Sequence, residues 1–495
     1  MRLSLPRLTE TPGKPSRKHI DTKSSWICLF PQPFGRSAQQ GFPYAAAMSR
    51  CRQRAGAKTT ENEPLIMDLP NTRSSHAAFA CIDPAIPAFE LLTLARKLVA
   101  AHDVKKISEL NISVHGFDEE TTERLAEAVI SAAFAAAAEM PAYKSADKQS
   151  VSLKSIRLYG IKTSHGFIRA RAEAEGNAVA RYLSMLPANM LTPATYLQHV
   201  QELADQYGWQ LSFMGINELK KKKAGAFLAV CQGSPDEDAG IVRLEYRPGR
   251  RAAGGLALAG KGICYDTGGV SLKPPKHMFG MHEDMQGSAV ALGTLIALTR
   301  LEVDIPVDCW LALAVNHIGS RAYKPNDVIT AVDGTTIEII NTDAEGRMVL
   351  ADTLALASLQ RPKLLIDYAT LTGACVYSVG TAYSGVFTNR DNYNPILIEA
   401  GRRSGERVWP FPMDDDYNKA LESKIADVKQ CTMDSTADHI LAAKFLQRFV
   451  KENTPWIHVD LASSSNKDGL AHVPTDTTGF GIRFTLNLLL DQKLV

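Results

Sequence analysis

A short charged segment between two apolar segments most constrains how this chain can fold. The sequence Asn341-Thr342-Asp343-Ala344-Glu345-Gly346-Arg347 follows a strand-like apolar run at 336–340 and precedes a helix-like apolar pattern at 348–356. Two carboxylates and a guanidinium placed between buried elements lose hydration, so they need a cation or an ion pair to compensate. In isolation, such a string could also be an acidic helix start in which Arg347 pairs with Glu345.

A second charged segment lies upstream and favours a cation site over that alternative. An apolar run at 255–259 predicts a buried strand. Lys261 is expected just beyond the end of this strand, where open α/β sheets place ligands. Asp266 and Asp284 follow, and the glycines between 260 and 269 permit tight turns and a close approach of the backbone to a ligand.

Together the two segments offer four carboxylates, those of Asp266, Asp284, Asp343 and Glu345. In one pocket these groups would repel each other, and two divalent cations would balance their formal charge. Paired metal ions that share oxygen ligands are a recurring hydrolytic device, and oxygen ligands suit Mg²⁺, Mn²⁺ and Zn²⁺. Burial beside two cations would lower the pKa of Lys261 enough for its amine to become a ligand.

These motifs resemble those of a known family. The segments GKGICYDTGGVSLKP at 260–274 and NTDAEGRMVLADTLALA at 341–357 closely resemble the leucyl aminopeptidase family, also called the cytosol aminopeptidases. LPANMLTPATY at 186–196 and IDYATLTGA at 366–374 resemble further stretches of that family. The resemblance extends over about residues 167–495, and the short N-terminal region and the ending TTGFGIRFTLNLLL are similar to bacterial peptidase B.

The resemblance implies a role for each matching residue. Two divalent metal ions, Mn²⁺ or Zn²⁺ with Mg²⁺ also open, would be held by Lys261, Asp266, Asp284, Asp343 and Glu345. Lys273 would polarise the scissile carbonyl, and Arg347 would hold a bicarbonate ion that relays a proton. The substrate would lie against Met281, Asn341, Thr370, Leu371 and Gly373.

The resemblance also implies an activity and an assembly. It indicates a metal-dependent aminopeptidase that hydrolyses the N-terminal bond of peptides with a free amine, by means of a hydroxide held between two metal ions. It further implies a homohexamer whose active sites face an interior cavity. One segment departs from the family pattern: residues 429–439 read KQCTMDSTADH where many relatives have a glycine-rich loop, which leaves the loop shape and the preferred substrate open. Cys431 and Asp434 in this segment receive no role.

Composition is typical of a soluble globular protein. A chain of 495 residues predicts two or more domains, and its contents of 45% hydrophobic and 22% charged residues are ordinary. The eight cysteines are dispersed without a C-x-x-C pair, as in a reducing cytoplasm. No apolar run reaches the roughly 18 residues needed to cross a membrane. We therefore expect a cytoplasmic enzyme without membrane contact.

The N-terminal segment differs from the rest in charge. The first 60 residues contain 11 Lys/Arg and 2 Asp/Glu, so they carry +9 while the remainder carries −7. A basic segment rich in Ser, Pro and Gln predicts a disordered extension over residues 1–67. It could be a transit peptide, or a translated upstream region with the start at Met48 or Met67. Its charge also raises nucleic-acid binding as an alternative function, which the acidic remainder disfavours.

Apolar periodicity divides the remainder into an α/β N-terminal domain at 68–150, a linker at 151–166 and a catalytic domain at 167–495. Strand-like runs of the catalytic domain are expected at 209–214, 226–231, 241–246, 255–260, 306–316, 336–341, 363–369 and 456–461. Helical patterns lie between them, notably at 286–300, 345–359, 391–404 and 437–451. This alternation predicts an α/β fold with a mostly parallel central sheet covered by helices. A run of four lysines, 220–223, is expected to be a solvated helix end.

Overall fold

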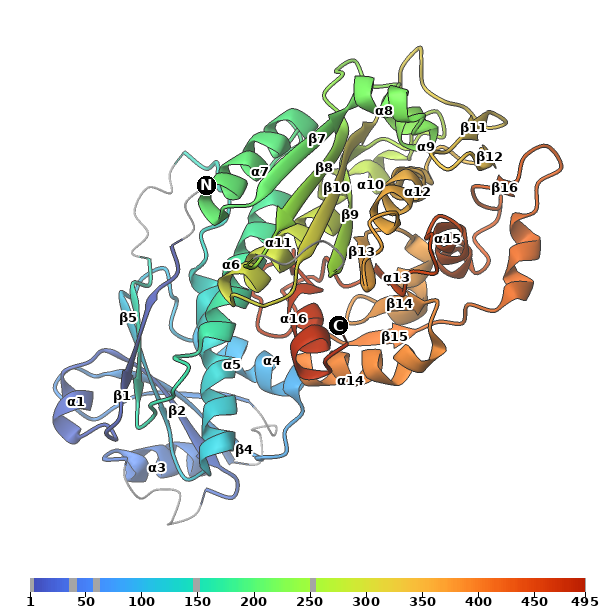
Figure 1. Cartoon of the computed structure of the whole chain (residues 1–495). Helices are drawn as coiled ribbons and strands as arrows, with labels where there is room; N and C mark the ends of the chain where they lie inside the picture. Colours follow the sequence, from blue (N-terminus) through green and yellow to red (C-terminus); the bar gives the residue numbers. More distant parts are fainter. Residues whose placement is uncertain (1–3, 35–41, 57–62, 146–151, 250–254, 495) are drawn as a thin grey trace.

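Two sheets organise the chain, one in each of the two lobes of the computed structural model (Figure 1). The structure describes residues 4–34, 42–56, 63–145, 152–249 and 255–494. The long helix α5 (Glu119–Ala137) lies beside the N-terminal sheet, and the helix after it, α6 (Ile168–Ser184), belongs to the larger lobe. None of the described helices combines the length and apolar character needed to cross a membrane.

The N-terminal lobe contains a six-stranded sheet in the order β1-β6-β5-β2-β4-β3. Its strands are β1 (Arg7–Thr11), β2 (Ser25–Pro31), β3 (Leu65–Asp68), β4 (His76–Ile82), β5 (Glu109–Val114) and β6 (Ser155–Tyr159). The helices that accompany them are α1 (Arg17–Asp21), α3 (Ala45–Ala55), α4 (Ala88–Ala100) and α5. Neighbouring strands are parallel except for the antiparallel pair β3 and β4.

The expectation of a disordered extension over residues 1–67 is wrong for the described part of that segment. Strand β2 lies inside the sheet, where it pairs with β4 and β5, and Trp26, Ile27, Cys28 and Leu29 are fully buried. A continuous apolar strand is typical of a parallel sheet covered on both faces. The basic composition of the flanking residues concealed this short run, because charge averaged over 60 residues says little about one strand.

The larger lobe is built on an eight-stranded sheet in the order β15-β14-β17-β13-β9-β10-β8-β7. Its strands are β7 (Gln210–Gly215), β8 (Gly240–Tyr246), β9 (Leu256–Asp266), β10 (Val307–Asn316), β13 (Leu364–Ala369), β14 (Ser384–Thr388), β15 (Val408–Pro410) and β17 (Trp456–Asp460). The inner strands β10, β9, β13 and β17 are parallel, whereas β8, β7 and β14 introduce antiparallel pairs. The expected mostly parallel sheet with covering helices is confirmed.

The helices of the larger lobe cover this sheet (Figure 1). They are α6, α7 (Pro193–Tyr207), α8 (Ile216–Lys222), α9 (Gly225–Cys231), α10 (Pro275–Met278), α11 (Gln286–Arg300), α12 (Glu345–Ser358), α13 (Gly373–Val379), α14 (Asn394–Ser404), α15 (Asp438–Gln447) and α16 (Ile482–Leu486). A small separate sheet joins β11 (Val328–Thr330), β12 (Thr336–Glu338) and β16 (Val428–Lys429). The short helices η2 (Met281–Glu283), η3 (Asp391–Tyr393), η4 (Asp415–Leu421) and η5 (Asn487–Asp491) complete the lobe.

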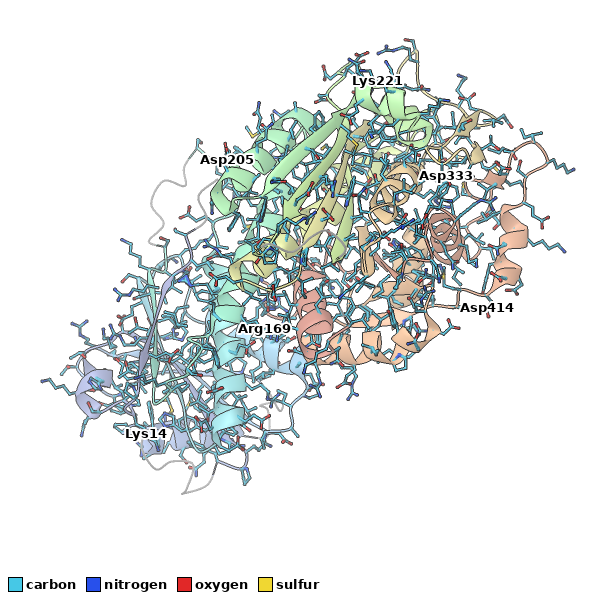
Figure 2. The ribbon with its side chains drawn as sticks, in the orientation of Figure 1. Lys14, Arg169, Asp205, Lys221, Asp333 and Asp414 are labelled. Atoms are coloured by element: carbon cyan, nitrogen blue, oxygen red, sulfur yellow. The ribbon has the colours of Figure 1, made fainter. Side chains whose placement is uncertain are left out.

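Two local expectations for this lobe are corrected by the structure. The run 226–231 forms helix α9 rather than a strand, since short apolar runs do not distinguish the two by periodicity. Lys261 lies inside β9 rather than beyond its end, because pairing with β10 continues the strand as far as Asp266. The lysine run is an exposed helix end as expected, and Figure 2 shows Lys221 at the outer end of the lobe.

Helix α11 packs directly on the central strand. A Cβ atom at Gly260 would lie 2.4 Å from the Cα of Ser288, so only glycine allows the helix this close to β9. On the other side of the same helix, a Cβ at Gly293 would lie 2.6 Å from the carbonyl oxygen of Gly176 in α6. These contacts hold the helix that follows Asp284 at a fixed distance from the strand that carries Lys261.

Burial of Trp26 gives a direct test of the N-terminal sheet. We expect Trp26→Ala to lower the free energy of unfolding of this lobe by roughly 3–5 kcal/mol, the usual cost of emptying a buried aromatic site. Lys18→Ala, an exposed change on α1, is the matched control. Chemical denaturation combined with hydrogen exchange of β2 measures the effect, and equal stability of the two variants would contradict the placement of β2 in a core.

Candidate functional site

Three carboxylates converge at the carboxyl end of the central strand. Asp266 is the last residue of β9, Asp343 lies in the turn before α12, and Glu345 is the first residue of that helix. One oxygen atom of each lies within 4.8 Å of those of the other two. Asp266 thus lies at the carboxyl end of a parallel strand, where open α/β sheets place ligands, and the start of the buried helix α12 brings Glu345 to it.

Lys261 connects this cluster to a fourth carboxylate. Its Nζ lies 2.7 Å from Oδ1 of Asp284 and 2.9 Å from Oε1 of Glu345. The same atom donates a 2.9 Å hydrogen bond to the carbonyl oxygen of Thr370. A Cβ at Gly346 would lie 2.7 Å from Cε of Lys261, so the first turn of α12 can press against the lysine only because this residue is glycine.

Lys273 makes the equivalent contacts on the other side of the cluster. Its Nζ lies 2.8 Å from Oδ2 of Asp266 and 2.5 Å from Oδ1 of Asp343. The loop that carries it turns sharply at Gly268, where φ is 84° and a Cβ would lie 2.8 Å from Oδ1 of Asp343. Each of the two ammonium groups therefore lies between two of the four carboxylates.

Burial raises the pKa of three carboxylates of this pocket, those of Asp284, Asp266 and Asp343. It raises the pKa of Asp284 to about 8, with the ammonium of Lys261 opposing the shift and the carboxylate of Glu345 adding to it. Burial also raises the pKa of Asp266, and Glu345 raises it further. The pKa of Asp343 is raised by burial and then by Asp266. Fully ionised, the four carboxylates would carry more negative charge than the two ammonium groups balance.

Burial alone would lower the pKa of the two lysines, yet the net pKa of each is raised. Burial lowers the pKa of Lys261, but the carboxylates of Asp284 and Glu345 outweigh it, so the net pKa is raised. The pKa of Lys273 is likewise raised, because Asp266 and Glu345 overcome the effect of burial. Both side chains are therefore ammonium groups at neutral pH, and Lys261 becomes a metal ligand only if an ion displaces its proton.

The donors present fit divalent metal ions. Oδ2 of Asp284 and Oε2 of Glu345 are buried without a hydrogen-bond partner among the described residues. Buried oxygens of this kind carry a desolvation cost that a cation would remove. Carboxylate oxygens are the ligands that hard and borderline divalent ions prefer. The pocket can thus accept added positive charge without rearranging its carboxylates.

Arg347 is buried in the first turn of α12, and its guanidinium contacts the segment after β16. Nη1 donates to the carbonyl oxygen of Gln430 at 3.1 Å, and Nη2 donates to Oδ1 of Asp438 at 2.9 Å. Nε has no hydrogen-bond partner among the described residues. Ion pairs join the other six charged candidates to one another, whereas the ion pair of Arg347 is with Asp438. A bicarbonate ion therefore fits this guanidinium poorly.

Three of the expected substrate contacts lie after β13. Thr370 Oγ1 donates to Oδ1 of Asp284 at 2.7 Å, so this side chain is directly beside the cluster. The N–H of Leu371 donates to Oδ1 of Asp460 at 3.2 Å, and Gly373 is the first residue of α13. Asp460 at the end of β17 thereby fixes the backbone of this segment.

The other two expected contacts flank the cluster in sequence. Met281 is half-buried and begins η2, the short helix before Asp284. Oδ1 of Asn341 accepts a 2.9 Å hydrogen bond from the N–H of Asp343 and so shapes the turn that presents this carboxylate. Both residues thus lie on segments that adjoin the cluster, and their contacts with substrate stay a prediction.

Several residues that shape the pocket were not identified from the sequence. Asn316 ends β10 beside Asp266, and its Nδ2 donates to Oδ1 of Asp266 at 2.8 Å and to the carbonyl oxygen of Thr342 at 3.0 Å. Its place at the end of an expected strand was the available signal. Gln430 and Asp438 lie in the divergent segment 429–439, where no motif marked them.

Fold and pocket together define a two-lobed α/β protein with a candidate divalent-metal site at the carboxyl edge of its central sheet. Residues 178–486 match the catalytic domain of the cytosol aminopeptidase family. The chain belongs to this family, which confirms the resemblance noted from its motifs.

Relatives are similar over most of the same region. A probable cytosol aminopeptidase of Syntrophotalea carbinolica is 42% identical over 322 residues, 65% of this chain and 64% of the relative. One from Wolbachia pipientis wMel is 40% identical over 330 residues, 66% of this chain and 65% of the relative. The matches thus span slightly under two thirds of these two proteins. The cytosol aminopeptidase of Rickettsia prowazekii is 34% identical over 399 residues, 79% of this chain and 80% of the relative.

A solved structure agrees in fold over both lobes. A mutant of tomato leucine aminopeptidase superposes with a TM-score of 0.84 and covers 99% of this chain and 97% of its own. Sequence identity with it is 24%, so the likeness describes the arrangement of the chain. The N-terminal lobe is included in this match, in agreement with its ordered sheet.

Removing one carboxylate tests the metal site. We expect Asp343→Ala to weaken divalent-metal binding by roughly 10–100-fold or more, because even indirect supports of a metal ligand have effects of this size. Asp414→Ala is the control, since this carboxylate is exposed at the far edge of the larger lobe (Figure 2). Elemental analysis after dialysis reports the metal bound per chain. Full occupancy in Asp343→Ala would exclude this side chain as a ligand.

Proposed function

We propose that this chain is a metal-dependent aminopeptidase that hydrolyses the N-terminal bond of peptides with a free amine. The observation that carries the proposal is the cluster of four carboxylates and two ammonium groups at the edge of the central sheet. Its setting in a member of the cytosol aminopeptidase family supports the same conclusion. A cytoplasmic location and a hexameric assembly are further proposals that rest on the family alone.

The metal site is assigned to Lys261, Asp266, Asp284, Asp343 and Glu345. Two divalent ions, Mn²⁺ or Zn²⁺ with Mg²⁺ also open, would supply the site for the substrate's amine and carbonyl oxygen and would make a bound water acidic enough to provide hydroxide near neutral pH. Pre-formed carboxylate positions reduce the reorganisation needed when the ions bind. A substrate without a free amine would lose part of this attachment, which accounts for exopeptidase specificity.

Lys273 is assigned the stabilisation of the developing oxyanion. Its ammonium stays charged at neutral pH because neighbouring carboxylates raise its pKa. It is also held in place by Asp266 and Asp343, so little reorganisation is needed during reaction. A positioned donor of this kind contributes roughly 3–4 kcal/mol to lowering the barrier.

The remaining candidates are assigned to substrate positioning. Thr370, Leu371 and Gly373 form one wall beside Asp284, and Met281 and Asn341 lie on the adjoining segments. The carbonyl of Thr370 and the N–H of Leu371 are held by Lys261 and Asp460. This wall is therefore rigid before substrate binds. No proton transfer is assigned to bicarbonate, because Arg347 is engaged by Asp438.

Substrate blocking tests the reaction type. After removal of metal with a chelator, we expect Mn²⁺ or Zn²⁺ to restore hydrolysis of aminoacyl amides, with N-acetylated analogues of the same compounds left uncleaved. A panel of amides with different side chains then reports the preferred residue. Equal cleavage of free and acetylated substrates would exclude the proposed exopeptidase, and hydrolysis that resists complete metal removal would exclude the metal site.

Substitution of Lys273 tests its role separately from metal binding. We expect Lys273→Ala to lower kcat by roughly 10²–10³-fold, the range found for loss of one oxyanion donor, while the metal content stays near that of the unaltered chain. Lys276→Ala, an exposed lysine three residues further on, is the control. Steady-state kinetics and elemental analysis of both variants give the answer, and normal kcat in Lys273→Ala would remove it from the mechanism.

A further inference from the structure

The surroundings of Arg347 differ from what an external oxyanion would need. A planar oxyanion grips a guanidinium in two places, either along the edge formed by Nε and Nη2 or along the edge formed by Nη1 and Nη2. Both edges include Nη2, and in this structure one of its two N–H groups donates to Oδ1 of Asp438 at 2.9 Å, while Nε has no partner among the described residues. Nη1 is in turn occupied by the carbonyl oxygen of Gln430.

Charge balance also disfavours an external anion at Arg347. The side chain of Arg347 is 2% exposed and that of Asp438 is 25% exposed, so their ion pair lies at the inner side of the segment and is poorly screened. Glu345 lies two residues before Arg347 in the same first turn of α12. A second anion at this guanidinium would face two carboxylates and a cation that is already neutralised.

The segment that carries Asp438 is fixed to the metal-ligand turn. Oε1 of Gln430 accepts from the N–H groups of Ile340 and Asn341 at 3.3 and 3.2 Å, and its Nε2 donates to the carbonyl oxygen of Ala344 at 2.9 Å. Gln430 is fully buried, so these bonds are shielded from water. Asp438 then begins α15, which brings its carboxylate back to Arg347. The ion pair is therefore part of the framework around the cluster.

We propose that Asp438 is a positioning residue that supplies, from within the chain, the carboxylate at Arg347, so that this protein does not bind bicarbonate there. The proposal rests on the proposed aminopeptidase function for its kinetic consequence only. Asp438 neutralises the guanidinium of Arg347 and, with the carbonyl oxygen of Gln430, engages Nη1 and Nη2, so an external oxyanion at the remaining donor Nε would meet the carboxylate of Asp438. Peptide hydrolysis then proceeds without added bicarbonate.

Bicarbonate binding is the direct test. The full-length zinc-loaded protein is titrated with ¹³C-labelled bicarbonate in carbonate-free buffer, and binding is followed by broadening of the ¹³C resonance. We expect no saturable binding to the unaltered chain, whereas Asp438→Ala should bind bicarbonate through the released guanidinium. The double change Asp438→Ala/Arg347→Met should abolish that binding. Asp434→Ala is the matched control, because it removes an exposed carboxylate from the same segment.

Kinetics give the second readout. We expect the unaltered chain and Asp434→Ala to hydrolyse aminoacyl amides at the same rate with and without bicarbonate. Asp438→Ala should lose roughly tenfold or more in kcat, the worth of one hydrogen bond to a charged group, and should regain much of it when bicarbonate is added. Recovery of kcat when bicarbonate is added would show that Asp438→Ala lost an anion at Arg347. A variant with a damaged fold would not recover.

Two results would overturn the proposal. One is saturable binding of bicarbonate by the unaltered chain that is lost in Arg347→Met. The other is a folded, metal-containing Asp438→Ala that gains no bicarbonate binding. Failure of the proposed function is separate, because a chain that hydrolyses no peptide with its metals bound would still give a clear result in the titration.

Discussion

Four carboxylates at one edge of the central sheet, three of them buried, are the constraint on which the rest of this structure depends. Their desolvation raises the pKa of Asp284, Asp266 and Asp343, and two ammonium groups offset only part of the charge. Such a cluster is costly in a folded chain unless further cations complete it. The scaffold therefore carries an electrostatic cost at this edge that metal binding would relieve, which links folding, metal uptake and catalysis.

The scaffold holds this charge by close packing of regular elements. Strand β9 supplies Lys261 and Asp266 from its interior and its end, and parallel neighbours on both sides fix its position. Gly260 lets the backbone of α11 pack on β9, and Gly346 leaves room for the side chain of Lys261 against α12. Loops that carry Lys273 and the acidic turn then need to span only short distances. The divergent segment 429–439 contacts this region through Gln430, which bonds the turn before α12, and through Asp438, which pairs with Arg347.

The sequence predicted the catalytic lobe and its charged pocket better than the N-terminal lobe. Asp343 and Glu345 were identifiable because a charged turn between two apolar segments has few structural interpretations. The regular structure of residues 4–34 was not predicted, because basic residues surround the single apolar strand around Trp26. The burial of this strand also depends on β4 and β5, which lie far along the chain. Asp438 was missed for a related reason: its partner Arg347 is 91 residues away, and no local pattern records that contact.

Anomalous diffraction from crystals of the Mn²⁺- or Zn²⁺-loaded protein tests the central claim most directly. Two peaks per chain among the side-chain donors of Lys261, Asp266, Asp284, Asp343 and Glu345 are the result expected here. Peaks at other positions, or an empty pocket in crystals of protein that still hydrolyses peptides, would contradict the account.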